Sequence, residues 1–343
     1  MGKGRKKQDT EDGQGTAAAT TSAAVTVPSG GYPTIDVEEI EGVGSLTAQK
    51  LRAAGYTTAR DVAFASVREI AEIIGSEDRA KNVIAAAQKL IGLQQFITAL
   101  ELYEKRRGIK RISTGVKSLD DLLGGGVETK AVTEVVGEFG AGKTQLCHQL
   151  SIMVQLPEEK GGLNAKALYV DAESTFRPER IMQIAKYRGL DPNEALKNIL
   201  YARALTSDHQ IMIIDEARKI IEKENIGIIL IDSLVSHFRA EYPGRENLAE
   251  RQQKLNHHIA QLLRLADIYN IAVVVTNQVV AQPDAFFTNP LKPAGGNVVA
   301  HGATYRVWLR KGKENVRIAK IFDSPYHPEK EVTFRITEEG VVD

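Results

Sequence analysis

The chain has 343 residues, 43% of them apolar and 26% charged, which is typical of a globular protein of about two domains rather than of a disordered or membrane protein. It has neither an apolar run near the roughly 20 residues of a membrane-spanning helix nor an N-terminal signal segment, so we expect a cytoplasmic protein with no membrane partner. A single cysteine excludes an internal disulfide, and because 44 basic residues balance 44 acidic ones, any basic surface must be local.

Residues 1–33 are expected to form a disordered tail. A basic cluster is followed by a tract rich in Ala, Thr, Gly and Ser, which has too few large apolar groups to offset the entropy of ordering. The cluster either solubilises this end of the chain or touches nucleic acid, and it consists of Lys3, Arg5, Lys6 and Lys7.

Residues 34–93 have the pattern of a small helical domain. Ile40, Leu46 and Leu51 are spaced as one apolar face, which Ile70 and the apolar positions up to Leu90 continue. Within IEGVGSLTAQKLRAAGY, residues 42–44 (Gly-Val-Gly) separate two helical stretches, as in a helix-hairpin-helix. This turn either lets backbone N–H groups approach a DNA phosphate or only joins two packed helices.

Residues 94–108 form a linker to the next unit. Phe96 and Ala99 stand three apart on it, a large and a small residue that could fill a pocket on another subunit. Without further information, packing of Phe96 into its own chain is the default expectation.

From Ile109 to Asp343 the sequence alternates between strands and helices, which predicts a mainly parallel α/β domain. Strands are predicted over 131–136, 166–173, 198–204, 227–232 and 270–278, and YRVWLRK with VRIAKIFD as a late antiparallel pair. Helices are predicted over 143–156, 211–221 and 255–265.

A glycine-rich loop after the first of these strands predicts a triphosphate site. The stretch GEFGAGKT fits G-x-x-x-x-G-K-[ST] between a strand and a helix, the context in which backbone N–H groups wrap phosphates. Lys143 then neutralises the β- and γ-phosphate oxygens of ATP, and Thr144 offers its hydroxyl to Mg²⁺. The predicted nucleotide-binding residues of the loop are Gly137, Glu138, Phe139, Gly140, Ala141, Gly142, Lys143, Thr144 and Gln145.

Polar residues at three strand ends complete the predicted site. Asp232 follows the buried strand IILI and is the candidate metal ligand, although an Asp there could also cap a helix. Glu173 is the candidate that activates water, with Asp171 as a competing assignment. Gln278 closes the strand VVVTNQ and is placed to sense the γ-phosphate.

Two polar segments follow strands at the same sheet edge and are predicted to be loops that contact a phosphodiester backbone. The first spans 233–255 and carries Arg239, Tyr242, Arg245 and Arg251. The second spans 279–297 and is rich in Gly, Pro and Asn; its Phe286 and Phe287 either meet bases or pack inward.

Several long motifs occur in order along residues 34–343, namely GEFGAGKTQLCHQL, DAESTFRPER, LIDS, YPGRENLAERQ and NQVVAQPDAFF through KPAGGNVVAHGATYRVWLRKG. Through them the chain resembles the archaeal RadA recombinases of the RecA superfamily. The resemblance implies a RecA-like P-loop ATPase core of the α/β class at 109–343, preceded by an all-α helix-hairpin-helix domain.

The resemblance also implies residue roles. Phe96 and Ala99 match the family's polymerisation motif, which overturns the default for Phe96. Glu173, Lys143 and Gln278 match catalytic positions, and the two loops match the DNA-binding loops, the second including Gly295, Gly296 and Asn297. Arg177 falls where members touch adenine, whereas the residues that reach a neighbouring subunit's nucleotide are His301, Asp323 and Pro328. Asp323 is also a candidate ligand for K⁺. Pro283 departs from the family pattern, which leaves the DNA role of the second loop open.

The function implied is that of a DNA-dependent ATPase that forms a filament on single-stranded DNA and pairs it with homologous duplex during recombinational repair. Implied partners are single- and double-stranded DNA, further copies of the chain in a filament or ring, and recombination mediators, in a nucleoid-associated location. The alternatives are a hexameric helicase on the same fold, which would not need the Phe96 motif, and a non-enzymatic paralogue that assists the recombinase.

Overall fold

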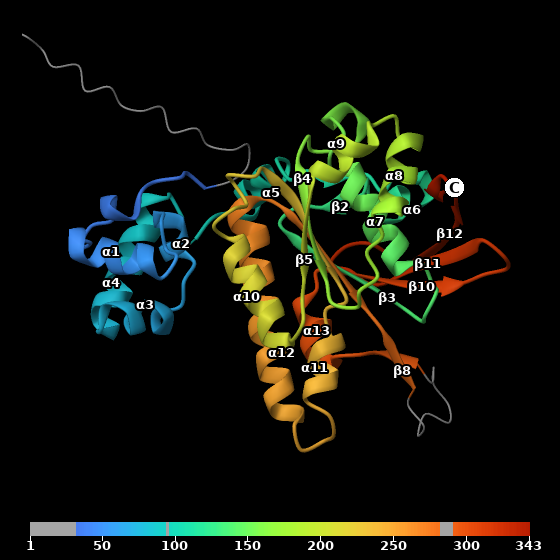
Figure 1. Ribbon diagram of the computed structural model, residues 1–343. Coiled ribbons are helices and arrows are strands. Elements are labelled where there is room, and N and C mark those ends of the chain that lie inside the picture. Colours follow the sequence, from blue (N-terminus) through green and yellow to red (C-terminus); the bar gives the residue numbers. More distant parts are fainter. Residues whose placement is uncertain (1–31, 94–95, 282–290) are drawn as a thin grey trace, which may run out of the picture.

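The computed structural model describes residues 32–93, 96–281 and 291–343 of the chain (Figure 1). The basic cluster of the predicted tail lies outside the described residues, as do Pro283, Phe286 and Phe287 of the second loop. None of the helices in these three ranges is both long and apolar enough to cross a bilayer.

The N-terminal unit consists of short helices around a small apolar core. Its elements are η1 (Val37–Glu39), α1 (Ser45–Ala53), α2 (Ala59–Ala63), α3 (Val67–Ile74) and α4 (Glu77–Leu90). The starts of α2 and α3 are fixed by capping boxes in which Thr58 pairs with Asp61 and Ser66 with Glu69. Gly44 precedes α1, and Gly42 has φ +86°, so the predicted hairpin glycines form the entry to that helix.

The predicted apolar face of this unit is wrong at Leu46 and Leu90, which are 73% and 37% exposed. In α1 the buried residues are Ala48 and Leu51. Leu46 precedes Ala48 by two positions, which places it on the opposite side of a helix with 3.6 residues per turn. Leu90 is the last residue of α4.

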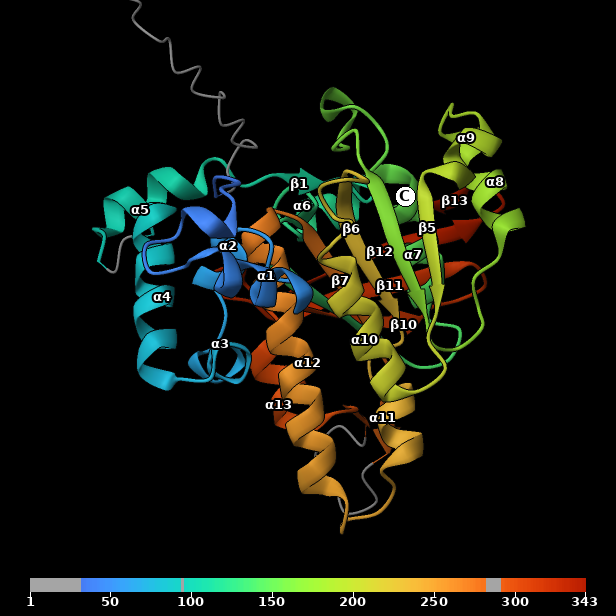
Figure 2. The same cartoon turned by 60° about the vertical axis from the view of Figure 1, so that its left-hand side comes forward.

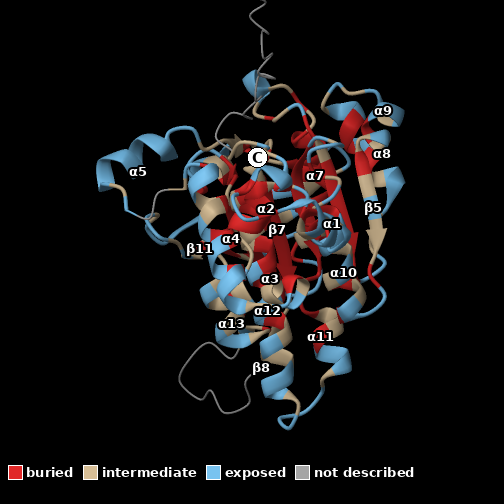
Figure 3. Cartoon of the chain, turned by 90° about the vertical axis from the view of Figure 1, so that its left-hand side faces the viewer, coloured by how far each residue is buried: buried red, intermediate tan, exposed pale blue. Residues whose placement is uncertain are grey.

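The helix α5 (Ala99–Arg106) follows and has no buried residue. It begins with a capping box between Thr98 and Glu101, and its last residue, Arg106, donates to Oε1 of Glu128 in the core at 2.9 Å. Figure 3 shows α5 standing away from the sheet with an exposed surface.

The core domain is built on a nine-stranded sheet of order β13-β12-β11-β10-β3-β7-β6-β4-β5. Six of its strands are parallel: β3 (Ala131–Gly137), β4 (Lys166–Asp171), β5 (Ile199–Arg203), β6 (Ile226–Asp232), β7 (Ala272–Asn277) and β10 (Tyr305–Lys311). An antiparallel extension adds β11 (Val316–Asp323), β12 (Lys330–Thr337) and β13 (Gly340–Val342). Strands β3, β6 and β7 are buried along their whole length, as expected of central strands covered on both faces.

Helices cover both faces of this sheet (Figures 1 and 2). One apolar cluster joins the sheet to α6 (Lys117–Leu122), α7 (Lys143–Met153), α8 (Pro178–Tyr187) and α9 (Pro192–Lys197). The other joins it to α10 (Ser207–Ala217), α11 (Ser236–Glu241), α12 (Leu248–Tyr269) and α13 (Gly296–Gly302). The α/β class with a mainly parallel sheet is therefore confirmed.

Smaller elements complete the core: η2 (Glu158–Lys160), a pair of β1 (Arg111–Ile112) with β2 (Val127–Glu128), and a pair of β8 (Val279–Ala281) with β9 (Leu291–Pro293).

The prediction of a loop over 233–255 is wrong. That segment forms α11 and the first turns of α12, because the apolar face at Leu255, Ile259 and Leu262 continues into a helix that begins at Leu248.

Candidate nucleotide site

The glycine-rich loop joins β3 to α7 at the carboxyl edge of the parallel strands. Gly142 has φ +105° and directly precedes α7; a Cβ there would lie 2.8 Å from Cδ1 of Ile336. The left-handed backbone therefore favours glycine, and a Cβ would also require the end of the Ile336 side chain to shift. Gly142 offers no side chain to cap α7, so the first N–H groups of that helix remain available for an anion.

A cleft of about 900 Å³ opens beside this loop. Its volume is within the range of about 300 to 1,000 Å³ that small-molecule and cofactor sites occupy. The predicted residues that line it are Gly137, Glu138, Phe139, Gly140, Gly142, Lys143, Thr144, Gln145, Glu173, Asp232 and Gln278. Ala141 is buried beneath the loop, whereas the Phe139 ring is 95% exposed.

Lys143 is held inside the loop. Its Nζ donates hydrogen bonds to the carbonyl oxygens of Gly137, at 2.8 Å, and Glu138, at 3.0 Å. Burial lowers the pKa of Lys143, and the neighbouring carboxylates of Asp232 and Glu173 oppose that shift. The ammonium thus lies within the loop, among the carbonyl oxygens of its first two residues.

Asp232 lies at the end of β6, and its carboxylate is buried and well provided with donors. Oδ2 accepts from the Thr144 hydroxyl at 2.7 Å and from Tyr169 at 3.1 Å, and Oδ1 accepts from Thr276 at 2.5 Å. The contact with Thr144 brings a carboxylate and a hydroxyl together, which is the oxygen donor set that P-loop proteins offer to Mg²⁺. No group of three or more His, Cys, Asp or Glu capable of holding a metal occurs among the described residues, so this pair would need water and phosphate as further ligands.

Glu173 and Gln278 meet over the cleft. Gln278 follows β7 and donates from Nε2 to Oε1 of Glu173 at 2.7 Å. Glu173 stands two residues beyond the end of β4 and is exposed. Asp171, the competing assignment, is buried and accepts backbone N–H bonds from Glu173 and Thr175 at 3.1 and 3.2 Å. It therefore fixes the turn that presents Glu173.

A group of buried polar side chains lies next to Gln278, and the sequence did not predict it. The Asn277 amide donates to Oε1 of Glu134 at 2.6 Å and to the carbonyl oxygen of Ala294 at 2.7 Å. The other oxygen of Glu134 accepts from Arg306 at 2.5 Å. These contacts join β3 to β7, which precedes the second loop in the sequence, and to β10, which follows it. They therefore hold the end of β7 from which Gln278 continues.

The cleft also has cationic walls that no motif indicated. Arg317 in β11 donates to the carbonyl oxygen of Gly140 at 3.1 Å, and Arg180 in α8 donates to Oε1 of Gln145 at 2.8 Å. Both residues come from segments far from the loop in sequence, and only the tertiary fold brings them to it.

Four predicted nucleotide contacts do not line this cleft: Arg177, His301, Asp323 and Pro328. Arg177 precedes α8, and its guanidinium donates to the backbone oxygens of Ser174 and Phe176. His301 lies in α13, Asp323 ends β11, and Pro328 lies between β11 and β12; all three are exposed. Their roles toward adenine and toward a neighbouring subunit's nucleotide stay predictions.

The described parts of the two predicted DNA-binding segments, α11 with the start of α12 and β8 with β9, lie on the same side of the core (Figure 1). Arg239 is in α11 and Arg251 in α12, and Arg251 donates to the carbonyl oxygen of Tyr242 at 3.0 Å. Arg245 is exposed in the connection between them. Gln252 of α12 donates to the carbonyl oxygen of Gly295 at 3.0 Å, which ties the end of the second segment to the first.

Gly295 and Gly296, with φ of +85° and +63°, lead into α13, and Asn297 follows them with an exposed side chain. A Cβ on Gly295 would lie 2.4 Å from Cγ2 of Val299. These glycines are therefore needed for the turn itself, whatever else they contact.

Phe96 is 91% exposed and Ala99 opens the exposed helix α5. The default expectation that Phe96 packs into its own chain is therefore wrong. Docking of this ring on a neighbouring core domain stays a prediction.

Comparison with known proteins agrees with this geometry. Residues 105–343, which contain the whole cleft, match the Rad51 family. The chain belongs to the Rad51 family. Residues 34–89 match the SAM-like helix-hairpin-helix tandem. The Rad51-family chain is also 52% identical over 309 residues to the DNA repair and recombination protein RadA of Aeropyrum pernix, a similarity that covers 90% of this chain and 97% of that protein.

Proposed function

We propose that this Rad51-family chain is a DNA-dependent ATPase recombinase that forms a helical filament on single-stranded DNA and promotes homologous pairing and strand exchange. The observation that carries the proposal is the convergence of the loop lysine, the Thr144–Asp232 pair and the Glu173–Gln278 pair on one cleft. The similarity to a DNA repair and recombination protein supports recombinational repair as the setting.

ATP with Mg²⁺ is the proposed cofactor pair, and its γ-phosphoryl group would be the one transferred to water. Lys143 and the N–H groups at the start of α7 bind the phosphates, and Thr144 and Asp232 hold the metal. Glu173 accepts the proton of the attacking water, since its carboxylate is exposed on the cleft. Gln278 lies between Glu173 and the second loop, so its amide is placed to report the state of the site to that loop.

Assembly and DNA contact involve surfaces that a single chain leaves open. Phe96 is the proposed anchor between protomers, and His301, Asp323 and Pro328 are exposed and available to a neighbour's nucleotide. Asp323 is the proposed ligand for K⁺. Arg239, Arg245 and Arg251 with Gly295, Gly296 and Asn297 are the proposed contacts to the DNA backbone. The proposed location is the cytoplasm, at the nucleoid, with recombination mediators as further partners.

Electron microscopy of the full chain with single-stranded DNA and a slowly hydrolysed ATP analogue tests the proposal. We expect long helical filaments that require both DNA and the analogue. Closed rings alone would instead indicate a helicase, and monomers alone a non-enzymatic paralogue.

Matched variants separate assembly from nucleotide binding. Phe96→Glu should bind nucleotide normally but form no filaments, because a charge replaces the proposed anchor. Tyr187→Glu changes another exposed aromatic residue, at the end of α8, and should assemble normally. Filaments of ordinary length from Phe96→Glu would contradict the docking role.

A further inference from the structure

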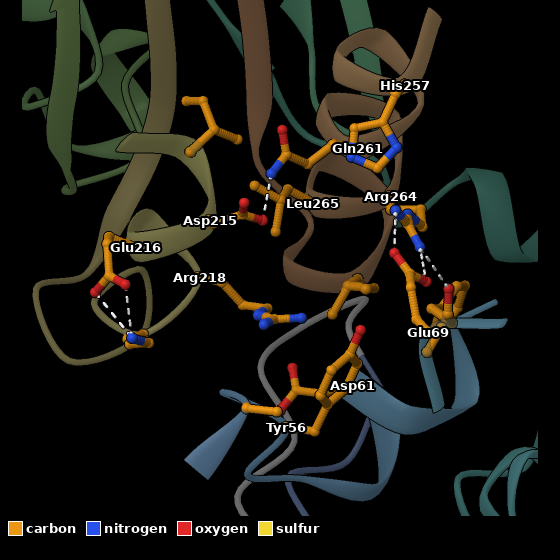
Figure 4. A pocket seen from close by; sticks show the side chains of 16 residues that line it. Tyr56, Asp61, Glu69, Asp215, Glu216, Arg218, His257, Gln261, Arg264 and Leu265 are labelled. Carbon is orange, nitrogen blue, oxygen red and sulfur yellow. Dashed lines mark hydrogen bonds and ion pairs between the residues drawn. The ribbon is translucent and has the colours of Figure 1, made fainter. Parts of the chain in front are cut away.

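A cavity of about 300 Å³ separates the N-terminal unit from α10 and α12 of the core (Figure 4). Its walls carry acidic and basic side chains in similar numbers, so it favours neither an anion nor a cation. Its significance lies in the contacts around it, which dock the N-terminal unit on the core.

Those docking contacts are polar. The Arg264 guanidinium holds Glu69 with two bonds, Nη1 to Oε2 at 3.0 Å and Nη2 to Oε1 at 3.3 Å. Burial alone would raise the pKa of Glu69, but the Arg264 fork and the Ser66 N–H lower it to about 2. The Tyr269 hydroxyl donates to Asp61 at 3.0 Å, also across the interface. Interfaces between domains of this polar kind permit relative motion.

Asp215 on the wall of this cavity is the exposed end of a chain of hydrogen bonds whose inner links are buried. Its Oδ1 accepts from the amide of Gln261 at 2.5 Å, and the two side chains face each other in Figure 4. Oε1 of Gln261 lies 3.1 Å from Nδ1 of His258, and Nε2 of His258 lies 3.2 Å from the amide nitrogen of Gln210. That same nitrogen donates to the carbonyl oxygen of Leu234 at 3.1 Å.

The far end of the chain reaches the nucleotide site. Leu234 is two residues after Asp232, and its N–H donates to the carbonyl oxygen of Thr276 at 3.0 Å. The hydroxyl of Thr276 in turn donates to Asp232. Asp232 also accepts a hydrogen bond from the Thr144 hydroxyl. A ligand that binds this hydroxyl would therefore remove one hydrogen bond from Asp232, at the start of the turn that ends at Leu234.

His258 is the centre of this chain. Because the Gln210 amide nitrogen is a donor, Nε2 of His258 must accept, and Nδ1 must then carry the proton that it gives to Gln261. Only the neutral ring fits this order, and burial accordingly lowers the pKa of His258 to about 4. The ring also stacks on Phe238 of α11, with centroids 5.9 Å apart.

We propose that His258 is a positioning residue that couples the nucleotide site to the docking of the N-terminal unit, through the hydrogen bonds from Leu234 to Asp215. The inference rests on the proposed function, since it takes nucleotide as the ligand of the cleft. Coupling of this kind is reciprocal: nucleotide changes the docking equilibrium by the same factor by which nucleotide affinity differs between the docked and undocked states, so a change that releases the docked unit must alter the observed affinity.

A double-mutant cycle on the full chain tests the coupling, with a fluorescent ATP analogue titrated in the absence of DNA. Glu69→Gln weakens the contact with Arg264, and we expect it to change the Kd about fivefold or more, in either direction. Glu72→Gln is the matched control, because Glu72 is on the same helix but pairs with Arg68 at the exposed surface. In the His258→Phe background, which keeps the ring stack and breaks the hydrogen bonds, Glu69→Gln should change the Kd less than twofold.

Amide hydrogen exchange gives the reciprocal measurement. Addition of nucleotide should change the exchange of residues 59–63 in α2 in the parent chain and in Glu72→Gln, but not in His258→Phe. If His258→Phe does not fold, Gln261→Met breaks the same chain one link further along and replaces it in both experiments.

The outcomes separate the two proposals. An equal effect of Glu69→Gln with and without His258, or no difference between Glu69→Gln and Glu72→Gln, overturns the coupling while nucleotide binding stands. A parent chain that does not bind the analogue overturns the proposed function, and the coupling with it.

Discussion

Glu173 and Gln278 show how single residues are set in place by different strands. Glu173 is presented by a turn that Asp171 fixes, and Gln278 reaches it from the end of β7. We predict that Glu173→Gln lowers the rate of ATP hydrolysis by about 10²- to 10⁴-fold, the usual contribution of a general base. Nucleotide affinity should stay within about threefold, because phosphate binding depends on Lys143 and the loop backbone.

The measurement is steady-state release of phosphate in the presence of single-stranded DNA, with affinity from a fluorescent nucleotide. Glu179→Gln is the control, since Glu179 is exposed in the first turn of α8 and does not line the cleft. ATP hydrolysis by Glu173→Gln at the rate of the parent chain would show that another group is the general base.

At this scale the sequence predicted the residues that belong to motifs and missed those that do not. The loop residues other than Ala141 line the cleft together with Asp232, Glu173 and Gln278, because strand ends and a glycine loop have recognisable local patterns. Arg180 and Arg317 were missed, since an arginine on a helix or strand gives no local sign of which loop it will contact. Between Asp171 and Glu173, only the backbone of the turn decides which carboxylate faces the cleft.

At the scale of elements, a buried ion pair links two neighbouring strands of the sheet. Arg306 in β10 is 7% exposed and pairs with Glu134 in β3, which is fully buried. We predict that Arg306→Met lowers the free energy of unfolding by about 3 to 5 kcal/mol, because it leaves a carboxylate buried without its partner. Replacing both residues by methionine should recover most of this loss.

Denaturant unfolding followed by the fluorescence of Trp308, the only tryptophan, reports on this same strand. Arg310→Met is the control on β10, where Arg310 and Glu331 form an exposed pair whose loss should cost at most about 1 kcal/mol. Equal destabilisation by both variants would show that the buried pair has no special weight.

Element prediction succeeded where the apolar pattern was continuous. Runs such as GIILID and the apolar part of NIAVVVTNQ became β6 and β7, and the antiparallel pair of β10 and β11 formed as expected. The prediction is wrong at Leu46, because a nine-residue helix buries only one narrow side. It is also wrong for much of 233–255, because polar residues that favour helix form α11 and the start of α12 there. The contact of Glu134 with Asn277 joins positions 143 residues apart, which no local pattern encodes.

The molecule as a whole places one buried histidine under each face of its sheet. His148 lies in α7 and His258 in α12, and burial is the main cause that lowers the pKa of each to about 4. The unfolded chain has ordinary histidines with a pKa near 6.5, so between about pH 6.5 and 4 it binds more protons than the folded chain. Folding stability is therefore complete above that window and falls as the pH falls through it.

This linkage gives a prediction for the core. Between pH 7 and pH 4.5 each of these histidines should lower the free energy of unfolding by roughly 2 to 3 kcal/mol. The Glu69 carboxylate, with its pKa of about 2, keeps its charge over the same range, so the contact with Arg264 should persist while the core weakens. Denaturant titrations at several pH values, again followed by Trp308, measure this free energy. In His258→Phe it should fall less steeply as the pH falls, and the difference from the parent chain should equal the contribution of one histidine.

His301→Gln, at an exposed position, should follow the parent chain. An unchanged slope in His258→Phe would mean that this ring is not held neutral between Gln210 and Gln261, which would also remove the basis for a directed chain of hydrogen bonds through it.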